Sequence, residues 1–326
     1  MNVNFQRKNA RFISVILCMA ILFALSGCGS KNDTVPETSD TSQAAVDTQE
    51  SVAEAELVRK LRKVETILVM GLDKYQAPQD AQGYLNDQQC DFLVLMILDR
   101  EHNVCDLLHL NRDTMTKIQR IGVGGGAAGS ITAQLALAHT YGSGGSDSCI
   151  NTKKAVSNLL GGIKIDHYIS MTMEAVAKVN DLAGGVTLEI MDDFSAVDPE
   201  LVQGQTMTLT GDHALHYVRY RHGLPDSTNL HRMERQRQYM NALNEQIKKC
   251  IAKDDDFLSK TIAKVSGYLQ SDYTINQMNA LARDLEKCTV NPFRTIDGEA
   301  VLGDEFMEFY VDEDSLQQVI SDLFYE

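Results

Sequence analysis

Phe92–Leu98 reads FLVLMIL and Val104–Leu110 reads VCDLLHL, two apolar runs separated by the short polar segment 99–103. Uninterrupted apolar runs of this length are typical of buried strands, and a short polar connection favours an antiparallel hairpin. A third run, Glu65–Asp73 (ETILVMGLD), is stopped by a glycine as a buried strand would be. The three runs therefore predict the centre of a β-sheet.

The hairpin predicts that polar residues gather at one edge of this sheet. In an antiparallel pair the start of one strand meets the end of the other, so Asp91 should lie near Arg112 and Asp113. If the first strand runs parallel to the third, Asp73 joins them. Open α/β sheets place ligands at such an edge. The sequence therefore predicts a ligand site with carboxylates and an arginine.

A second cluster of charge lies late in the chain, in residues 219–237, RYRHGLPDSTNLHRMERQR. Its guanidinium groups belong to Arg219, Arg221, Arg232, Arg235 and Arg237, in a chain whose formal net charge is -15. Helical spacing places Arg232, Arg235, Gln236 and Tyr239 on one stripe, and the preceding segment GDHALHYVRY, after Thr210, predicts another capped helix. Most charge runs are solvated faces. Here the basic run departs from an acidic background, and guanidinium forks suit phosphate oxygens, so we favour a phosphate clamp.

The N-terminus has the pattern of a signal peptide. Basic residues precede the apolar run Phe12–Leu25, and the small residues before Cys28 resemble a lipobox, which implies cleavage after residue 27 and a lipid anchor on Cys28. An uncleaved membrane helix is the alternative, although the run is short against the roughly 20 residues that span a bilayer. Both interpretations place the protein at the extracytoplasmic face of the membrane.

Composition bounds the rest of the chain. With 326 residues and 44% hydrophobic side chains, the chain is long enough to bury a full core. We expect a signal peptide at 1–27, a disordered acidic tether at 28–60 and one catalytic domain at 61–326, with its motifs in 63–250 and a packing region in 254–326. Without residues 1–27 the charge is 27 basic minus 45 acidic, or -18, which argues against nucleic acid as a partner.

Helices and strands alternate through the middle of the chain. We expect a helix from Asn151 to Gly161, a helix at Met173–Leu182 and a strand at Val186–Ile190. The glycine-rich segment 122–145 lacks the lysine of a nucleotide-binding P-loop, and we interpret it as mobile loops flanking a helical piece, Ile131–Tyr141. The pattern predicts one α/β domain with a mixed sheet. The packing region should add helices at Phe257–Leu269, Ile275–Cys288 and Ser315–Phe324, and a strand near Arg294–Asp297.

Cysteine and histidine give weaker signals. Of seven cysteines, five remain once Cys18 is cleaved off and Cys28 is lipidated, and Cys90 and Cys105 are not opposite each other on their strands, so we predict no disulfide between them. His213 and His216 are three residues apart on a helix and could in principle bind a metal. With no further ligand in the local sequence, an ordinary surface or packing role is favoured.

These residues, taken in order, resemble the LytR-CpsA-Psr family over about residues 63–250. The motifs that carry the resemblance are Gly71-Leu72-Asp73, Cys90-Asp91, Asn111-Arg112-Asp113-Thr114, Ala138-His139-Thr140-Tyr141-Gly142, Gly184-Gly185-Val186, Leu209–Ala214, Tyr217-Val218-Arg219-Tyr220-Arg221 and Arg232-Met233-Glu234-Arg235-Gln236. Any one of these motifs is weak, but the series in this order is specific.

The resemblance implies a three-layer α/β/α sandwich that encloses an apolar tunnel, and an extracytoplasmic phosphotransferase. Such an enzyme moves an anionic glycopolymer, such as wall teichoic acid or capsule, from undecaprenyl pyrophosphate to a hydroxyl of peptidoglycan. Two alternatives stay open: a non-catalytic lipoprotein that binds polyprenyl phosphate or polymer, and a polyprenyl pyrophosphatase that uses water as acceptor.

By position, the resemblance also implies roles for individual residues. Asp73 and Asp91 look like the pair that binds Mg²⁺ (or Mn²⁺), and they form the catalytic set together with Arg112 and Arg232. The ligands of the pyrophosphate look like Arg112, Arg219, Arg221, Arg232, Arg235 and Gln236. The general base is open between Asp73 and Asp113, and Asp113 could instead simply position Arg112.

This chain departs from the family pattern at two of these positions. It has Gln89 where the family usually has an arginine, and Asn229 where an aspartate is common.

Overall fold

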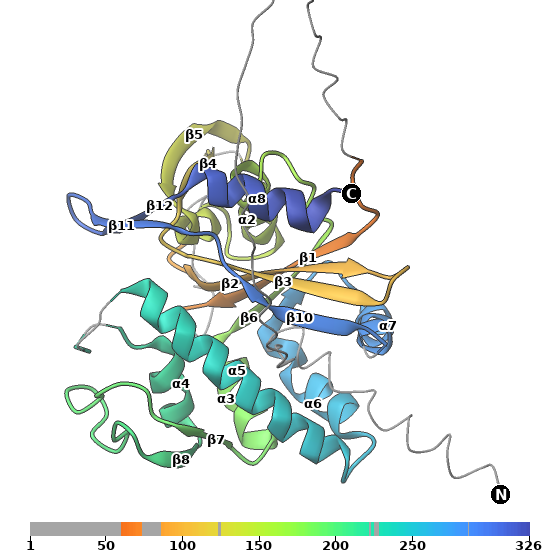
Figure 1. Cartoon of the computed structure of the whole chain (residues 1–326), viewed down its shortest axis with the longest axis vertical. Coiled ribbons are helices and arrows are strands. Elements are labelled where there is room, and N and C mark those ends of the chain that lie inside the picture. The colour runs from red at the N-terminus through yellow and green to blue at the C-terminus, as the bar shows by residue number, and fades with distance from the viewer. Residues whose placement is uncertain (1–59, 74–85, 123–124, 222, 225–227, 286) are drawn as a thin grey trace, which may run out of the picture.

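The computed structural model describes residues 60–73, 86–122, 125–221, 223–224, 228–285 and 287–326. Within these residues the largest sheet has six strands in the order β10-β3-β2-β1-β6-β9 (Figure 1). Its strands are β1 (Glu65–Leu72), β2 (Cys90–Asp99), β3 (Val104–Leu110), β6 (His167–Thr172), β9 (Leu269–Ser271) and β10 (Thr289–Arg294).

The predicted hairpin forms the centre of the sheet. β2 and β3 pair antiparallel with Leu93 opposite Leu110 and Leu98 opposite Cys105. β1 pairs antiparallel with β2, so β1 and β3 run in the same direction, as the site prediction required. β6 is parallel to β1 and β10 is parallel to β3. The sheet is therefore mixed, as predicted, although β6 was not foreseen.

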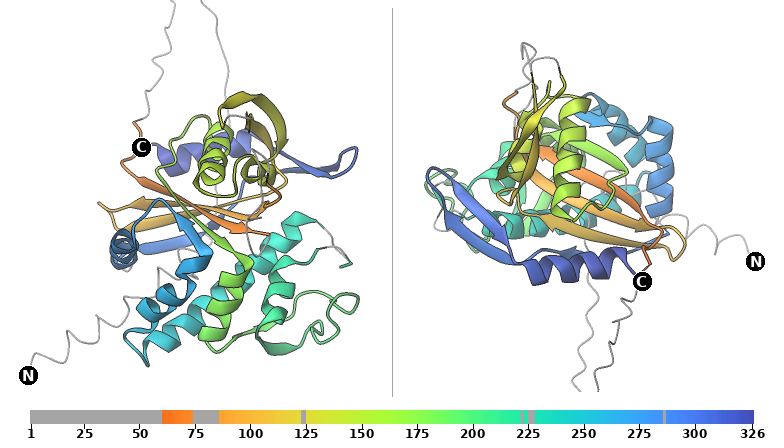
Figure 2. Two further views of the ribbon diagram at one scale, coloured as in Figure 1. Left: turned by 180° about the vertical axis from the view of Figure 1, so that it is seen from behind. Right: turned by 90° about the horizontal axis from the view of Figure 1, so that it is seen from above.

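Successive side chains of the central strands point to opposite faces of the sheet, so the hydrophobic core is divided into two layers. Ile67 and Val69 of β1 face one hydrophobic cluster, and Leu68 and Met70 face the other. The first cluster includes residues of α3 to α7, and the second includes residues of α2 and α8. Figures 1 and 2 show these helices on opposite sides of the sheet. The architecture is the predicted three-layer α/β/α sandwich, because each face of a buried strand needs its own apolar cover.

One layer contains α2 (Ser146–Leu159), α8 (Glu313–Phe324) and the 3-10 helix η2 (Leu135–Thr140). α2 ends beside Gly161 as predicted but begins before Asn151, which is buried inside the helix. The prediction of a helix at Ile131–Tyr141 was wrong in its first part. Residues 131–134 belong to a strand, and Gly125 and Gly126 lie in the turn that precedes it rather than in a loop flanking a helix.

The other layer contains α3 (Met173–Leu182), α4 (Asp212–Arg219), α5 (Asn229–Ile251), α6 (Phe257–Val265), the 3-10 helix η3 (Ser266–Tyr268) and α7 (Ile275–Leu285). α3 has the predicted bounds. α4 is preceded by Gly211 at its N-cap and has no side-chain cap, so Thr210 does not cap it. α6 is shorter than predicted, because the chain from Ser266 turns into η3 and then β9.

Three two-stranded ribbons formed by the described residues lie outside the main sheet. They are β4–β5 (Met115–Ile121 and Ala127–Gln134), β7–β8 (Val186–Glu189 and Thr206–Leu209) and β11–β12 (Gly298–Leu302 and Met307–Val311). The strand predicted at Val186–Ile190 is thus present but pairs with β8. The strand predicted near Arg294–Asp297 lies earlier in the chain than expected. It is β10, which spans Thr289–Arg294.

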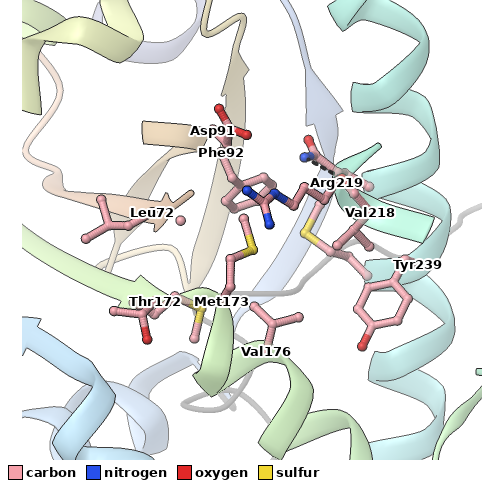
Figure 3. A pocket seen from close by; sticks show the side chains of 13 residues that line it. Leu72, Asp91, Phe92, Thr172, Met173, Val176, Val218, Arg219 and Tyr239 are labelled. Atoms are coloured by element: carbon pink, nitrogen blue, oxygen red, sulfur yellow. Dashed lines mark hydrogen bonds between the residues drawn. The ribbon is translucent and has the colours of Figure 1, made fainter. Parts of the chain in front are cut away.

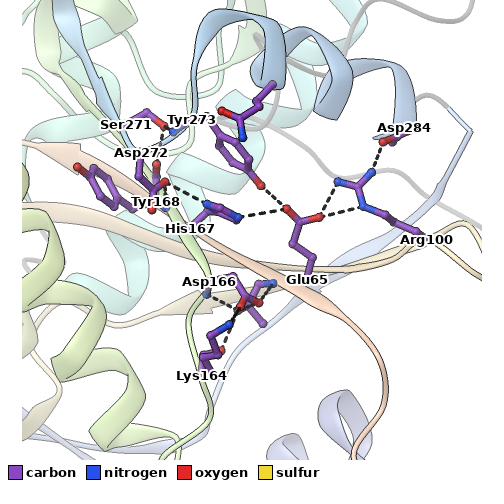
Figure 4. Close-up of polar contacts among 12 residues, drawn as sticks. Glu65, Arg100, Lys164, Asp166, His167, Tyr168, Ser271, Asp272, Tyr273 and Asp284 are labelled. Atoms are coloured by element: carbon purple, nitrogen blue, oxygen red, sulfur yellow. Dashed lines mark hydrogen bonds and ion pairs between the residues drawn. The ribbon is translucent and has the colours of Figure 1, made fainter.

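A polar network fastens the far end of the sheet, where β1 begins (Figure 4). Glu65 contacts Arg100 and the Tyr273 hydroxyl, and His167 stacks on the Tyr273 ring with 4.2 Å between ring centroids. This network holds the start of β1 against β6 and the segment before α7. The opposite end of β1 is followed by Asp73 and lies at the polar cluster described below.

Several expectations fall outside the described residues. The signal peptide, Cys28 and almost all of the acidic tether belong to residues 1–59. Among the residues that the structure does describe, no helix is both long and apolar enough to cross a membrane. Cys90 and Cys105 are both free and buried, which confirms that they form no disulfide with each other.

Candidate active site

Two aspartates lie on neighbouring strands at one end of the sheet. Asp73 follows β1, and its Oδ1 accepts a hydrogen bond from the backbone N–H of Gln89 at 2.8 Å. Asp91 is the second residue of β2 and is 8% exposed. The pairing of β1 with β2 is irregular between Gly71 and Leu72, just before Asp73. Antiparallel pairing therefore brings the two carboxylates to the same edge.

Arg112 reaches this edge from the end of β3, as the hairpin predicted. Its Nη1 forms an ion pair with Asp91, and its Nη2 donates to the side-chain oxygen of Gln89 at 2.6 Å. Its Nε lies 3.2 Å from Asp113 Oδ1. The guanidinium is thus fixed from three sides, and Gln89 supplies one of its hydrogen-bond acceptors.

Arg232 approaches Asp91 from helix α5. Its Nη1 lies 3.1 Å from Asp91 Oδ2, while Nε and Nη2 donate to Asn229 Oδ1 at 3.0 and 2.6 Å. Asn229, one turn earlier on the same helix, is anchored through its own Nδ2 to Asn111 Oδ1 at 2.6 Å. The amide at position 229 therefore orients Arg232 and ties the start of α5 to the end of β3.

Arg221 completes the cluster from the segment after α4. Its Nη1 lies 2.8 Å from Asp113 Oδ2. Asp113, which is 3% exposed, thus lies between Arg112 and Arg221. This geometry favours the positioning role that the sequence left open for Asp113, because both of its oxygens face guanidinium groups.

Charge in the cluster favours a bound anion. The guanidiniums of Arg112, Arg219, Arg221 and Arg232 gather at this end of the sheet with the carboxylates of Asp73, Asp91 and Asp113, so four positive charges meet three negative ones, an excess of one. Burial alone would raise the pKa of Asp91, but Arg232 and Arg112 hold that pKa below its ordinary value. Burial lowers the pKa of Arg232 to about 10, so this side chain stays charged at neutral pH.

An apolar pocket opens directly beside the cluster (Figure 3). Its lining residues come from β1, β2, β6, α3, α4 and α5 and are Gly71, Leu72, Asp91, Phe92, Met171, Thr172, Met173, Val176, Val218, Arg219, Gln236, Tyr239 and Met240. In Figure 3, Asp91 and Arg219 lie at one end, and Met173 and Val176 lie at the other. The pocket is therefore amphipathic, with charge at one end and apolar side chains at the other.

The pocket is narrow in this conformation. It encloses about 60 Å³, against roughly 300–1,000 Å³ for ordinary ligand sites. Three of its lining residues are methionines, namely Met171, Met173 and Met240. Methionine is unbranched and changes rotamer easily. A long apolar ligand would therefore enter by displacing these side chains.

Two predicted ligands lie at the polar end of the pocket. Arg219, the last residue of α4, is exposed and extends across the pocket beside Phe92 in Figure 3. Gln236 lines the pocket from α5, but its Nε2 donates to the carbonyl of Val218 at 3.1 Å. In this rotamer its side-chain N–H groups are partly occupied, so Arg219 is the freer donor.

Arg235 differs from the prediction. It is fully buried, with its Nε 2.9 Å from Asp192 Oδ2 and its Nη1 donating to the carbonyl of Tyr217 at 3.1 Å. Its guanidinium also lies over the Phe194 ring, 5.1 Å from the centroid. Arg235 therefore anchors α5 to the end of α4 and to the segment after β7. We leave it out of the proposed phosphate ligands.

Asp73 and Asp91 are the carboxylates at this end of the sheet that could hold a hard divalent cation. Proteins usually hold Mg²⁺ through one or two carboxylates, and phosphates of the substrate supply further oxygen ligands. One carboxylate from each of two neighbouring strand ends meets that requirement. Because Arg112 and Arg232 face the oxygens of Asp91, a cation there would share this carboxylate with the two guanidiniums.

The sequence predicted the apolar half of the site only as the tunnel that the family resemblance implies, and it did not identify the apolar residues of its wall. Phe92, Met171, Met173 and Met240 carry no signal that separates a pocket wall from an ordinary core residue, because both are apolar positions on regular elements. Asn229 and Gln89 were noted only as departures from a family pattern. Their hydrogen bonds to Arg232 and Arg112 depend on the folded structure, which brings residues distant in sequence together.

Comparison with known proteins agrees with the fold and the motifs. The family model described as LytR_cpsA_psr matches residues 31–324. The polyisoprenyl-teichoic acid–peptidoglycan teichoic acid transferase TagU of Halalkalibacterium halodurans is 31% identical over 182 residues, which cover 56% of this chain and 52% of that protein. The corresponding transferase TagV of Bacillus subtilis is 29% identical over 269 residues, 79% of this chain and 64% of that protein.

The crystal structure of B. subtilis TagV has a similar fold, with a TM-score of 0.59 and 26% identity. The superposed region covers 80% of this chain and 96% of the crystallised one. The sequence matches to TagU and TagV span only about half to two thirds of those relatives.

Proposed function

The chain belongs to the LytR-CpsA-Psr family, and on this premise we propose that it transfers an anionic glycopolymer from a polyprenyl pyrophosphate carrier to a hydroxyl of peptidoglycan. The observation that carries the proposal is the convergence of Arg112 and Arg232 on Asp91 at the charged end of an apolar pocket. A diphosphate joined to a hydrocarbon tail has the same two-part chemistry. The printed names of the relatives, teichoic acid transferases, support the same substrate class.

In the proposed reaction, a peptidoglycan hydroxyl attacks the phosphorus that bears the glycopolymer. The P–O bond to the polyprenyl phosphate breaks, a phosphodiester to peptidoglycan forms, and polyprenyl phosphate leaves. Phosphoryl transfer passes through a loose transition state with charge on the phosphoryl and leaving oxygens, so fixed cations contribute most of the catalysis. Arg112 and Arg232 are held in place by buried partners, while Arg219 and Arg221 can approach the phosphates from α4 and the segment after it.

We propose that Asp73 and Asp91 hold Mg²⁺, or Mn²⁺, against the diphosphate. The ion would supply additional positive charge to the phosphate oxygens. The hydroxyl proton needs an acceptor as well. Asp73 and Asp113 are the two candidate carboxylates for this role, and Asp113 already faces Arg112 and Arg221.

The N-terminal pattern extends the proposal to location. We propose that Cys28 carries a lipid anchor and that residues 28–60 tether the domain to the extracytoplasmic face of the membrane. A polyprenyl carrier is itself confined to the membrane, so an anchored enzyme meets its donor there. Labelled fatty acid should be incorporated into the wild type and not into Cys28→Ser, and a wild type that takes up no label would contradict the lipid anchor.

A product assay tests the reaction. The full chain is incubated with a polyprenyl-pyrophosphate-linked glycopolymer and Mg²⁺, with and without peptidoglycan oligomers, and both products are measured. The proposal expects polymer on peptidoglycan together with polyprenyl phosphate, and neither product in Arg112→Ala. Polyprenyl phosphate released equally without peptidoglycan would identify a pyrophosphatase. Tight binding with no product in either condition would identify a carrier-binding protein.

A further inference from the structure

A cluster between α4 and the segment that joins β7 to β8 combines two imidazoles and a carboxylate. His213 and His216 lie one turn apart on α4, and Asp198 comes from the segment between β7 and β8. The Nδ1 atoms of His213 and His216 lie 2.8 and 2.6 Å from the same oxygen, Asp198 Oδ2. Three potential ligand atoms thus converge on one point, each within 4.8 Å of the others.

The carboxylate is fixed before any ligand arrives. Asp198 is 6% exposed, and its Oδ1 accepts the backbone N–H of Glu200 at 3.3 Å, which leaves Oδ2 directed at the imidazoles. The backbone N–H of Asp198 donates to the carbonyl of Phe194 at 2.8 Å, so a tight turn holds the residue. The third ligand is therefore preorganised by the fold.

Glu200 matches the second requirement of a metal site. A metal needs the lone pair on Nδ1 of His213, so the ring proton must sit on Nε2. Glu200 Oε2 lies 3.3 Å from that Nε2 and can accept the proton's hydrogen bond. Histidines that bind metals almost always donate their other ring N–H to such an acceptor, which fixes the tautomer and raises the basicity of the ligand.

We propose that Asp198, His213 and His216 bind one Zn²⁺ ion. Two nitrogen donors and one oxygen donor suit Zn²⁺ and its transition-metal neighbours, whereas Mg²⁺ and Ca²⁺ prefer oxygen ligands alone. The side chains of His213 and His216 are 30% and 33% exposed, so water can complete a tetrahedral shell. This site is separate from the carboxylates at Asp73 and Asp91, and it does not rest on the proposed transfer reaction.

The ion would join two elements that flank the candidate active site. α4 ends in Arg219, which lines the pocket, and the segment after β7 also carries Asp192, the partner of Arg235 (Figure 1). Zn²⁺ bound across them would add a link between α4 and this segment. A ligand that binds only the folded state stabilises the fold by mass action, so Zn²⁺ should raise the midpoint of thermal unfolding.

The test uses the full chain freed of metal by chelation. Zn²⁺ affinity is measured by competition with a chromophoric chelator, and Co²⁺ is used as a spectroscopic probe of tetrahedral nitrogen and oxygen coordination. One tight ion per chain is expected, with a tetrahedral Co²⁺ spectrum that Zn²⁺ abolishes and millimolar Mg²⁺ does not. Asp198→Asn and His216→Ala should each lose that ion, and Glu200→Gln should weaken it about 10-fold.

His102→Ala is the matched control, because His102 Nδ1 also lies 2.9 Å from a carboxylate, Asp99 Oδ2, but without a second histidine. It should keep full affinity. The proposal is overturned if the wild type shows no tetrahedral Co²⁺ spectrum, or if Asp198→Asn and His216→Ala bind Zn²⁺ as tightly as the wild type. Circular dichroism checks that each variant is folded. If a variant is unfolded, the Co²⁺ spectrum of the wild type alone tests the proposal.

Discussion

Arg232 Nη1 lies 3.1 Å from Asp91 Oδ2, although 141 residues separate the two in sequence. The contact joins helix α5 to strand β2, and Arg112 meets the same carboxylate from the end of β3. A carboxylate between two buried guanidiniums neutralises them only in part. The local excess of positive charge, next to an apolar pocket, is the physical basis of the proposed site for a polyprenyl diphosphate.

Arg219→Ala should separate catalysis from stability. Arg219 is exposed and lines the pocket, so its removal should change the free energy of unfolding by less than about 0.5 kcal/mol. Loss of one donor to a developing phosphate charge typically lowers the rate about 100- to 1000-fold. Transfer rates and urea unfolding measure the two effects. Arg294→Ala, which removes an exposed arginine paired with Asp322, is the control and should retain full activity.

Arg235→Ala should have the opposite profile. Arg235 is fully buried and paired with Asp192, so its removal leaves this buried carboxylate with His231 but without its guanidinium and should cost about 3 kcal/mol of unfolding free energy. Adding Asp192→Asn should recover part of that loss, because it removes the uncompensated charge. If Arg235→Ala were as stable as the wild type but inactive, Arg235 would be a phosphate ligand after all.

Asn229→Ala should weaken the site through Arg232. The Asn229 side-chain oxygen accepts from both Nε and Nη2 of Arg232, so the variant leaves two buried N–H groups without their acceptor, at about 1–3 kcal/mol. Asn229→Asp keeps a charged acceptor for Arg232. Its second carboxylate oxygen replaces the Nδ2 donor, however, and so faces the oxygen Asn111 Oδ1 without a hydrogen bond. Unfolding should rank the wild type first, Asn229→Asp second and Asn229→Ala last. An Asn229→Ala protein with wild-type stability would contradict this role.

Acid should destabilise the fold through Asp99. Burial alone would raise the pKa of Asp99, but hydrogen bonds from His102 and Arg62 outweigh burial and lower that pKa from 3.8 to about 2. A lowered pKa in the folded state adds stability above the unfolded value of about 4, and this stability is lost as the pH falls toward 2. Asp99→Asn should therefore be less stable at pH 7 and lose less stability between pH 4 and pH 2. Parallel stability curves for the two proteins would contradict this assignment.

The sequence predicted those parts of the fold that depend on local periodicity and strand geometry. The apolar runs identified β1, β2 and β3, and antiparallel pairing alone was enough to bring Asp91 next to Arg112. The stripe of α5 predicted that Arg232 faces inward. In each case a regular element fixes where successive side chains point, so spacing in sequence carries over into space.

Contacts made by irregular segments could not be predicted in the same way. Arg235 shares its stripe with Arg232, but Asp192 and Phe194, which hold it, lie in a segment without periodicity. Asp198, which joins the two histidines of α4, lies in that same segment. Strand β5 was missed because Ala, Gly and Ser make up its first half, Ala127–Ser130, and these residues have little strand propensity.

A structure of the full chain bound to a polyprenyl pyrophosphate and Mg²⁺ is the most direct test of the central claim. We expect the diphosphate to lie within hydrogen-bond distance of Arg112 and Arg219. The hydrocarbon tail should run between Met173 and Tyr239, with changed rotamers at the methionines of the pocket. A lipid bound elsewhere, with the Arg112–Asp91–Arg232 cluster and the pocket both unchanged, would contradict it.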